Sequence, residues 1–194
     1  MHAYDVLLKV HRIGSRISGT VVARDEPDGS LGTAAGQATL KTETAYPALL
    51  PYSHLVDELS SFSPKIVPQV GAKVEAVVFN FVDGILYLSA KPNDLSEATI
   101  RKWRDYYDYI GSLAIGAEIT GRVQRVMPFG LFVNIGGPFI GLIDIGHVRF
   151  NGGVQLPYDP ADWPKEGEEI HCNIGYFRLH DQQIGLGWLR VNGA

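Results

Sequence analysis

Hydrophobic and polar residues alternate over short stretches of the chain, and glycine or proline separates most of these stretches. The alternation is clearest within VGAKVEAVVFNFVDGILYLS (70–89) and EGEEIHCNIGYFRLHDQQIGLG (166–187). Each of these segments reads as an alternating strand, a polar turn and a short last strand, which is typical of antiparallel β structure with one buried face. The pattern predicts a mainly β protein.

One segment in the middle of the chain departs from this pattern. Residues 93–112, NDLSEATIRKWRDYYDYIGS, place four apolar side chains on one helical stripe: Ile100, Trp103, Tyr107 and Ile110. Asp94 or Ser96 is a suitable N-cap, and Gly111 is a suitable C-terminal stop. We expect a helix whose apolar stripe packs against one or both flanking domains, with a partner-binding helix as the alternative.

The chain repeats itself on either side of this predicted helix. Three blocks recur in the same order: IGSRISGTV with IGAEITGRV, ALLPYSHL with GLIDIGHV, and residues 70–89 with residues 166–187. Each repeat contains about five short strands separated by turns, a pattern that predicts a small barrel. The expected organisation is one repeat at 1–92, a linker helix at 93–112 and a second repeat at 113–194.

Residues 126–137, VMPFGLFVNIGG, carry an unusual density of apolar side chains. Strict alternation places Leu131 and Val133 on one face and Phe132 on the other. Gly130 allows a bend or bulge that turns Phe129 toward the side of Phe132. Two interpretations remain open at this point: a strand buried on both faces, or two rings on an open face that stack against a flat ligand.

Charge and composition limit the ligands and the cellular location that can be expected for the protein. The formal net charge is −4, with 17 basic and 21 acidic residues, and neither the linker nor either repeat is basic. Any nucleic-acid affinity must therefore come from local patches and stacking. No apolar stretch is long enough to span a bilayer, no signal peptide is evident, and the single cysteine, Cys172, lies in an apolar alternation. These features predict a cytoplasmic protein without a membrane segment.

The second repeat resembles the S-one RNA-binding domain, a five-stranded OB fold named for a ribosomal protein. The resemblance rests on spaced motifs in order: IGAEITGRV, PFGLFV, GLIDIGHV, EGEEIHCNIGYF and IGLG. They cover residues 113–190, while residues 13–91 resemble the same domain more weakly. The resemblance implies that an open face of the barrel binds single-stranded RNA through two aromatic rings, a histidine, an acidic residue and a basic residue.

Carried over to this sequence, the two aromatic positions are Phe129 and Phe132, and stacking a base on a ring tolerates any base. The histidine position falls on Asp144, which is a departure from the family. The acidic and basic positions fall on Leu179 and Gln183, or on their neighbours if HDQQ contains a one-residue gap. The remaining candidates are a local histidine and arginines that could contact phosphate: His147, Arg122, Arg125, Arg149 and Arg178.

The first repeat departs further from the family pattern. In place of PFGLFV it has ARDEPDGSLGTAAGQATLKTET (23–44), which contains no aromatic residue and reads as an extended hairpin or a mobile loop. Pro51 stands at the histidine position and Ile85 at the basic position. Tyr46, Tyr52 and His54 are the remaining candidates there, and packing explains them better. We expect this repeat to be structural or to dock onto a ribosomal or other protein.

No pattern in the sequence predicts an enzyme. The chain contains no Gly-x-x-x-x-Gly-Lys phosphate loop, no Gly-x-Ser-x-Gly elbow, no Cys-x-x-Cys pair and no histidine spacing suited to a metal. We therefore expect no cofactor, no metal and no catalytic residue. The leading hypothesis is single-stranded RNA binding by the second barrel in translation, ribosome association or RNA metabolism. The alternative is an OB-type module that binds a protein partner without RNA.

Overall fold

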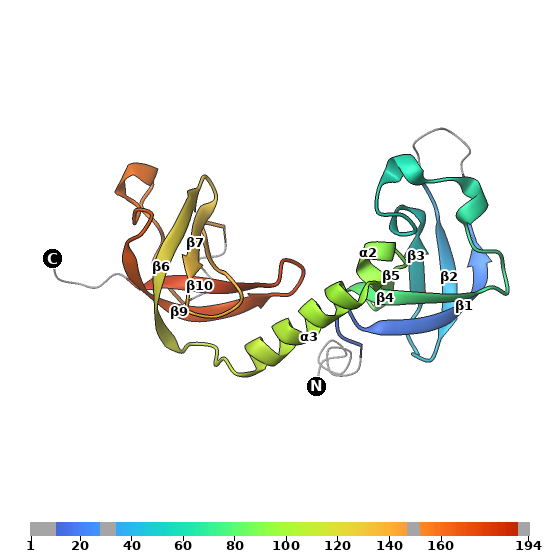
Figure 1. Ribbon diagram of the computed structural model, residues 1–194, viewed down its shortest axis with the longest axis horizontal. Helices are drawn as coiled ribbons and strands as arrows, with labels where there is room; N and C mark the ends of the chain where they lie inside the picture. The colour runs from blue at the N-terminus through green and yellow to red at the C-terminus, as the bar shows by residue number, and fades with distance from the viewer. Residues whose placement is uncertain (1–10, 28–33, 147–151, 190–194) are drawn as a thin grey trace. The chain divides into compact units, whose positions relative to one another are not determined.

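The computed structural model describes residues 11–27, 34–146 and 152–189. The chain forms two compact units, Met1–Arg104 and Asp105–Ala194, and each contains one closed five-stranded barrel (Figure 1). The prediction of a mainly β fold with two OB-type barrels in tandem, joined through a helical segment, is confirmed. No helix among the described residues is both long enough and apolar enough to cross a membrane.

The first barrel closes in the order β1-β2-β3-β5-β4. Its strands are β1 (Arg16–Arg24), β2 (Gln37–Thr42), β3 (Ala48–Pro51), β4 (Lys73–Val82) and β5 (Ile85–Ser89). Only β3 and β5 pair in parallel; the other pairs are antiparallel. Three short 3-10 helices connect β3 to β4: η1 (Tyr52–His54), η2 (Leu59–Ser61) and η3 (Pro64–Ile66).

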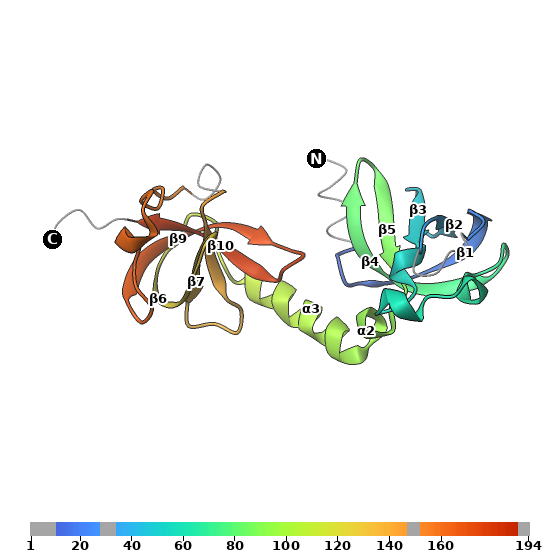
Figure 2. The same cartoon turned by 90° about the horizontal axis from the view of Figure 1, so that it is seen from above.

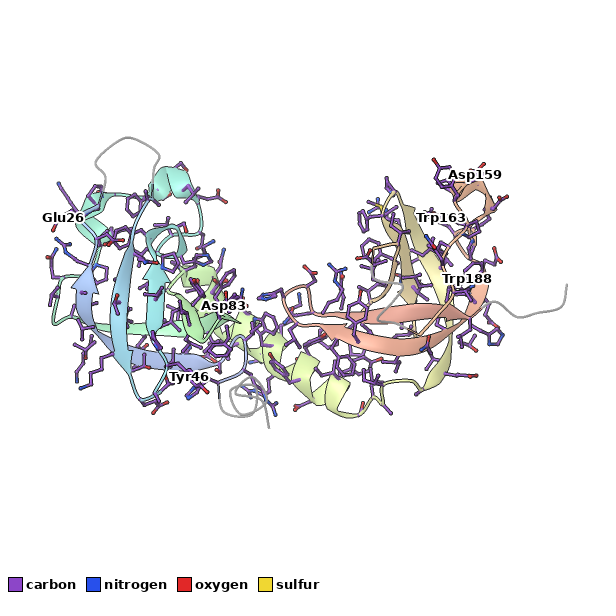
Figure 3. All side chains as sticks on the ribbon, turned by 180° about the vertical axis from the view of Figure 1, so that it is seen from behind. Glu26, Tyr46, Asp83, Asp159, Trp163 and Trp188 are labelled. Carbon is purple, nitrogen blue, oxygen red and sulfur yellow. The ribbon has the colours of Figure 1, made fainter. Side chains whose placement is uncertain are left out.

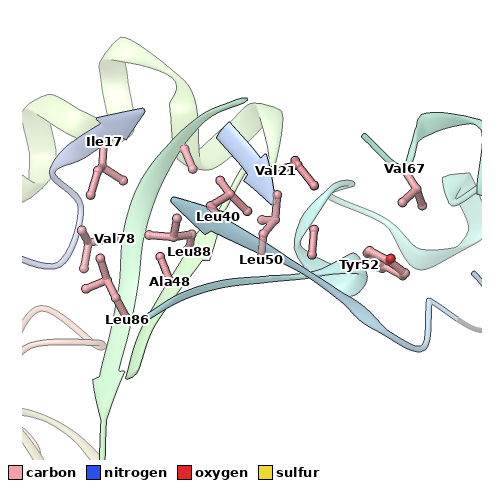
Figure 4. Packing of buried hydrophobic residues seen from close by; sticks show 12 residues of the cluster. Ile17, Val21, Leu40, Ala48, Leu50, Tyr52, Val67, Val78, Leu86 and Leu88 are labelled. Atoms are coloured by element: carbon pink, nitrogen blue, oxygen red, sulfur yellow. The ribbon is translucent and has the colours of Figure 1, made fainter. Parts of the chain in front are cut away.

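Alternate side chains of these strands fill the interior of the first barrel (Figure 4). Leu50, Leu86 and Leu88 have no exposed surface, and Tyr52 is equally buried. The Tyr52 hydroxyl donates to the carbonyl of Asp25 at 2.5 Å, which satisfies the polar end of the ring inside the apolar core. Packing therefore accounts for Tyr52, as expected.

The second barrel closes in the corresponding order, β10-β8-β7-β6-β9. Its strands are β6 (Glu118–Met127), β7 (Gly130–Asn134), β8 (Gly141–Asp144), β9 (Glu169–Arg178) and β10 (Gln183–Leu189). The loop between β8 and β9 contains η4 (Pro160–Asp162) and the buried Trp163, whose indole N–H donates to the Pro157 carbonyl at 2.7 Å (Figure 3).

Strand register shows how closely the two barrels correspond. In the first barrel Thr39 lies opposite Leu49, and in the second Phe132 lies opposite Leu142. Counting two residues further along β3 and β8 brings Pro51 and Asp144 to equivalent positions. The same comparison shows that QATLKT is β2 itself, the counterpart of β7. Where the insert is described, it forms the antiparallel β1–β2 hairpin, one of the two forms expected for it.

The predicted helix at 93–112 is divided into α2 (Pro92–Leu95) and α3 (Glu97–Gly111). The break falls at Ser96, which is extended with ψ 143°, and its hydroxyl accepts from the Thr99 amide at 3.2 Å. Ser96 is therefore the N-cap of α3, one of the two caps predicted. The helix ends at Gly111, as expected (Figure 2).

The two ends of α3 belong to different units. In the part of α3 that belongs to the first unit, the ring of Trp103 covers Gly14 so closely that a Cβ at Gly14 would overlap it. Further along, Tyr106 is completely buried in the second unit and packs edge-on against Phe139, with ring centroids 5.0 Å apart. The predicted apolar stripe omitted Tyr106. Trp103 packs within the first unit and Tyr106 within the second, so the helix buries side chains on more than one of its faces.

Candidate nucleic-acid interface

The turn between β6 and β7 presents Phe129. Met127 pairs with Gly130, so Pro128 and Phe129 form a two-residue connection and the ring stands at its tip. Gly130 has φ +148°, and a Cβ at this position would overlap the carbonyl oxygen of Ile143. Only glycine fits there, which explains why the run of apolar residues is interrupted at this point.

The structure decides between the two interpretations of this segment. Leu131 and Val133 are fully buried in the barrel, whereas Phe132 points outward and Phe129 is 43% exposed. The two rings contact each other edge to face, with centroids 5.9 Å apart and planes at 85°. Both aromatic side chains therefore stand on an accessible face.

A row of residues crosses this face from strand to strand. Arg125 lies opposite Phe132, Phe132 opposite Leu142, Leu142 beside Gly185, and Gly185 opposite Tyr176. Arg178 of β9 lies opposite Gln183 of β10, two residues from this row, and Asp144 lies two residues beyond Leu142 on β8, opposite Gly130. We call this surface the aromatic face and define it by its exposed or partly buried members: Arg125, Phe129, Phe132, Asp144, Tyr176, Arg178 and Gln183.

Tyr176 is a member that the sequence did not predict. Its ring lies directly over Gly185, where a Cβ would overlap the ring atoms. A bulge causes this placement, because Leu186 pairs with Ile174 and Gly185 pairs with Tyr176, which leaves Gly175 without a partner. Simple alternation from Cys172 and Ile174 would have placed Tyr176 in the core. Burial raises the pKa of Tyr176, so its hydroxyl stays protonated near neutral pH.

An ion-pair network connects three strand and turn residues of the aromatic face and its edge: Asp144, Arg178 and Asp181. The Nη1 group of Arg178 donates to Asp144 Oδ2 at 2.8 Å. Its Nε and Nη2 groups both donate to Asp181 Oδ2, at 3.0 and 2.7 Å. Burial by itself lowers the pKa of Arg178, but the hydrogen bond to Asp181 and its charge outweigh that effect and raise it.

This network modifies the expectation for the basic position. The β9–β10 register places Arg178 opposite Gln183, while Leu179 lies in the turn that follows β9. A guanidinium group is therefore present beside Gln183, on the neighbouring strand. The acidic group of the face is Asp144.

The other predicted residues are distributed differently. Arg125 is exposed beside Phe132, and none of the described residues forms an ion pair with it. Arg122 is also exposed, but its Nη1 group donates to the carbonyl of Gly167 at 2.8 Å, further along β6. Gln183 is half-buried within the aromatic face. His147 and Arg149 lie outside the described residues.

The equivalent surface of the first barrel has a different chemistry. Register places Thr39 where the second barrel has Phe132, and Val82 opposite Ile85 where it has Arg178 opposite Gln183. None of the residues that register makes equivalent is charged: Ala23, Thr39, Leu49, Pro51, Asn80, Val82, Ile85 and Tyr87. Tyr46 packs edge-on against Phe81 at 5.1 Å and His54 lies 4.2 Å from Phe79 between ring centroids, so packing accounts for both.

The aromatic face can stack against a flat ligand and can accept and donate hydrogen bonds, but none of its residues is an activated nucleophile. Cys172 is buried, and desolvation raises its pKa to about 12, which keeps the thiol neutral. The described part of the chain contains no group of three or more histidine, cysteine or acidic side chains arranged to hold a metal ion.

Comparison with known families agrees with this geometry. Residues 112–175 match the sequence model of a family described as the S1 RNA binding domain, the same family as the S-one domain. The matched segment begins directly after α3 and extends into β9, so it includes both phenylalanines and Asp144. The resemblance inferred from the spaced motifs is confirmed.

Two curated proteins are similar over longer segments. The polyribonucleotide nucleotidyltransferase of Maricaulis maris (strain MCS10) is 29% identical over 114 residues, which are 57% of this chain and 14% of that protein. The small ribosomal subunit protein bS1 homolog of Bacillus subtilis (strain 168) is 26% identical over 140 residues, 72% of this chain and 33% of that protein. The chain thus spans a third or less of either relative.

Among solved structures, GSP13 from Bacillus subtilis is 22% identical, with a TM-score of 0.33. The match covers 40% of this chain and 56% of that protein.

Proposed function

We propose that the second barrel, an S1 RNA-binding domain, binds single-stranded RNA on its aromatic face and serves translation, ribosome association or RNA metabolism. The observation that carries this proposal is the pair of rings: Phe129 is 43% exposed and contacts Phe132 on the same face as two arginines. The names of the two relatives, a polyribonucleotide nucleotidyltransferase and a ribosomal protein, support an RNA ligand. The proposed activity is binding alone.

The balance of charges on the aromatic face sets the expected strength of binding. Arg125 and Arg178 are offset by Asp144 and by Asp181 at its edge. Stacking on an aromatic ring contributes about 1–3 kcal/mol per base and is tolerant of sequence. We therefore expect modest affinity, little base preference and a shallow salt dependence, because few phosphates are neutralised.

Titration of a labelled single-stranded RNA against the wild-type protein and the Phe129→Ala/Phe132→Ala double variant tests this proposal. Loss of both rings should weaken binding by about 2 kcal/mol or more, roughly thirtyfold. Fluorescence anisotropy at low salt measures both affinities.

Phe79→Ala is a matched control. Phe79 belongs to the first barrel and is 39% exposed, close to the exposure of Phe129, but it lies outside the aromatic face. This variant should bind RNA as tightly as the wild type. Equal affinity of the double variant and the wild type would remove the stacking mechanism.

For the first barrel we propose a protein partner rather than RNA. The observation that favours it is the uncharged surface at the positions equivalent to the aromatic face, where Val82 is 43% exposed. A surface of this kind gives no electrostatic attraction to phosphate, whereas exposed apolar side chains suit a protein interface.

Affinity capture with ribonuclease treatment distinguishes the two kinds of partner. A stoichiometric protein that survives ribonuclease and is lost in a Val82→Glu variant would support a protein interface on the first barrel. Capture that depends entirely on RNA would contradict it.

A further inference from the structure

The guanidinium group of Arg178 is held by two carboxylates that differ in how firmly they are fixed. Asp144 uses both of its oxygens: Oδ2 accepts from Arg178 and Oδ1 accepts from the Gly146 amide at 2.7 Å. Its side chain is only 15% exposed. Asp144 is therefore a fixed part of the barrel, and it holds one edge of the guanidinium group in place.

Asp181 is attached more loosely. It lies in the turn between β9 and β10, its side chain is 49% exposed, and among the described residues only its Oδ2 is bound. That single oxygen receives both the Nε and the Nη2 groups of Arg178. Exposed ion pairs of this kind contribute little to stability, so exchanging Asp181 for another anion costs little.

The edge of Arg178 that Asp181 occupies suits a phosphate. The Nε and Nη2 groups of arginine form a planar fork that binds carboxylate and phosphate in the same geometry. This fork is part of the aromatic face, and the strand register places it opposite Gln183. The proposed stacking site and a phosphate-binding fork are therefore on the same face of the barrel.

We propose that Arg178 is the phosphate-binding residue of the aromatic face and that Asp181 occupies the place of the phosphate in the free protein. RNA binding then exchanges Asp181 for a phosphate, while Asp144 keeps the guanidinium group in position. Asp181 thereby acts as an internal competitor that lowers the affinity for RNA. This inference rests on the proposed function and assigns a regulatory contact to the same site.

A double-mutant cycle with a single-stranded oligouridine tests the exchange. Asp181→Asn should bind about fivefold more tightly than the wild type, because the competing anion is removed. Arg178→Gln should bind more weakly, and the slope of log affinity against log salt should become shallower by about 0.7, the value for one phosphate contact on a single strand. In the Arg178→Gln background, Asp181→Asn should produce no gain.

Glu118→Gln is the control for a general charge effect. Glu118 is an exposed acidic residue of the same barrel, and none of the described hydrogen bonds or ion pairs involves its side chain. Its removal should change the affinity equally in the wild-type and Arg178→Gln backgrounds. A gain from Asp181→Asn that persists without Arg178 would overturn the exchange in favour of long-range repulsion.

Two further outcomes separate this inference from the proposed function. If the wild type binds the oligouridine and Asp181→Asn binds equally well, the exchange is wrong while RNA binding stands. If none of the proteins binds, the proposed function fails and the inference with it. Should Arg178→Gln prove unfolded by circular dichroism, Arg178→Lys replaces it: the ammonium group keeps the charge but not the fork, so the gain from Asp181→Asn should shrink.

Discussion

Single residues on the aromatic face are brought to the surface by bulges. Val123 and Arg125 pair with consecutive residues of β7, so Gln124 is an extra residue, and Gly175 is the extra residue of β9. Each bulge reverses the alternation that follows it, which turns Arg125 and Tyr176 outward. The first barrel has bulges at the equivalent places, and their extra residues, Val22 and Phe79, are both exposed.

Gly130 has the strictest requirement of the residues that shape this face. Replacement by alanine would force a left-handed backbone onto a residue with a Cβ and press that atom into the Ile143 carbonyl. We expect Gly130→Ala to lower the free energy of unfolding by about 2–4 kcal/mol. Urea denaturation followed by circular dichroism measures the loss.

Gly136→Ala provides the comparison for this substitution. Gly136 also has a positive φ, +79°, but no atom lies within 4 Å of the position of its Cβ. Only the cost of the positive φ remains, and we expect the free energy of unfolding to fall by about 1 kcal/mol. Similar losses in the two variants would show that the contact with Ile143 does not matter.

At the scale of elements, α3 is hydrogen-bonded to the β9–β10 hairpin through Tyr106. The Tyr106 hydroxyl donates to the carbonyl of Gln183 at 2.8 Å and lies 3.3 Å from the carbonyl of Arg178. These two residues face each other across the hairpin and carry side chains of the aromatic face. The helix therefore anchors the segment that presents the guanidinium group.

Removal of this hydroxyl should loosen the hairpin without opening the core. Tyr106→Phe removes the hydrogen bonds of this hydroxyl to the Gln183 and Arg178 carbonyls, at a cost of about 1–2 kcal/mol. Hydrogen exchange should increase most in β9 and β10. Tyr109→Phe is the matched control, since its hydroxyl makes no hydrogen bond to a described residue and the change should be small. Equal exchange in the two variants would contradict an anchoring role for Tyr106.

At the scale of the whole molecule, two barrels with the same strand order have acquired different surfaces. Their interiors keep equivalent register, with Leu50 in the first barrel where the second has Ile143. Their outer rows differ in charge and aromatic content. This pattern supports a division of labour in which the second barrel binds RNA and the first binds protein.

The boundary of the second unit can be tested by truncation. A fragment of residues 105–194 retains Tyr106 and Tyr109, whereas a fragment of residues 113–194, the boundary predicted from the sequence, lacks both. Loss of a fully buried aromatic side chain costs about 3–5 kcal/mol, so the shorter fragment should melt at least about 10 °C lower. Thermal unfolding by circular dichroism measures the difference. Equal melting temperatures would show that α3 is dispensable for the second barrel.

The sequence by itself determined the two barrels, the helix between them and the placement of Phe132 on the face of its strand opposite to Leu131 and Val133. These features follow from local rules, because alternation, turn glycines and helix caps act over a few residues and recur in both repeats. The sequence also showed that Asp144, Pro51 and Ile85 depart from the family pattern, because these positions are found by counting along the matched blocks.

Only the tertiary structure decided which charges meet on the aromatic face. Arg178 and Asp144 are 34 residues apart, and Arg178 faces outward only because a bulge at Gly175 reverses the alternation of β9. Tyr106 likewise reaches the Gln183 carbonyl across 77 residues. Contacts of this kind depend on strand register and chain closure, which no local pattern records, and they give the aromatic face a guanidinium group that the sequence placed only as one of several candidates.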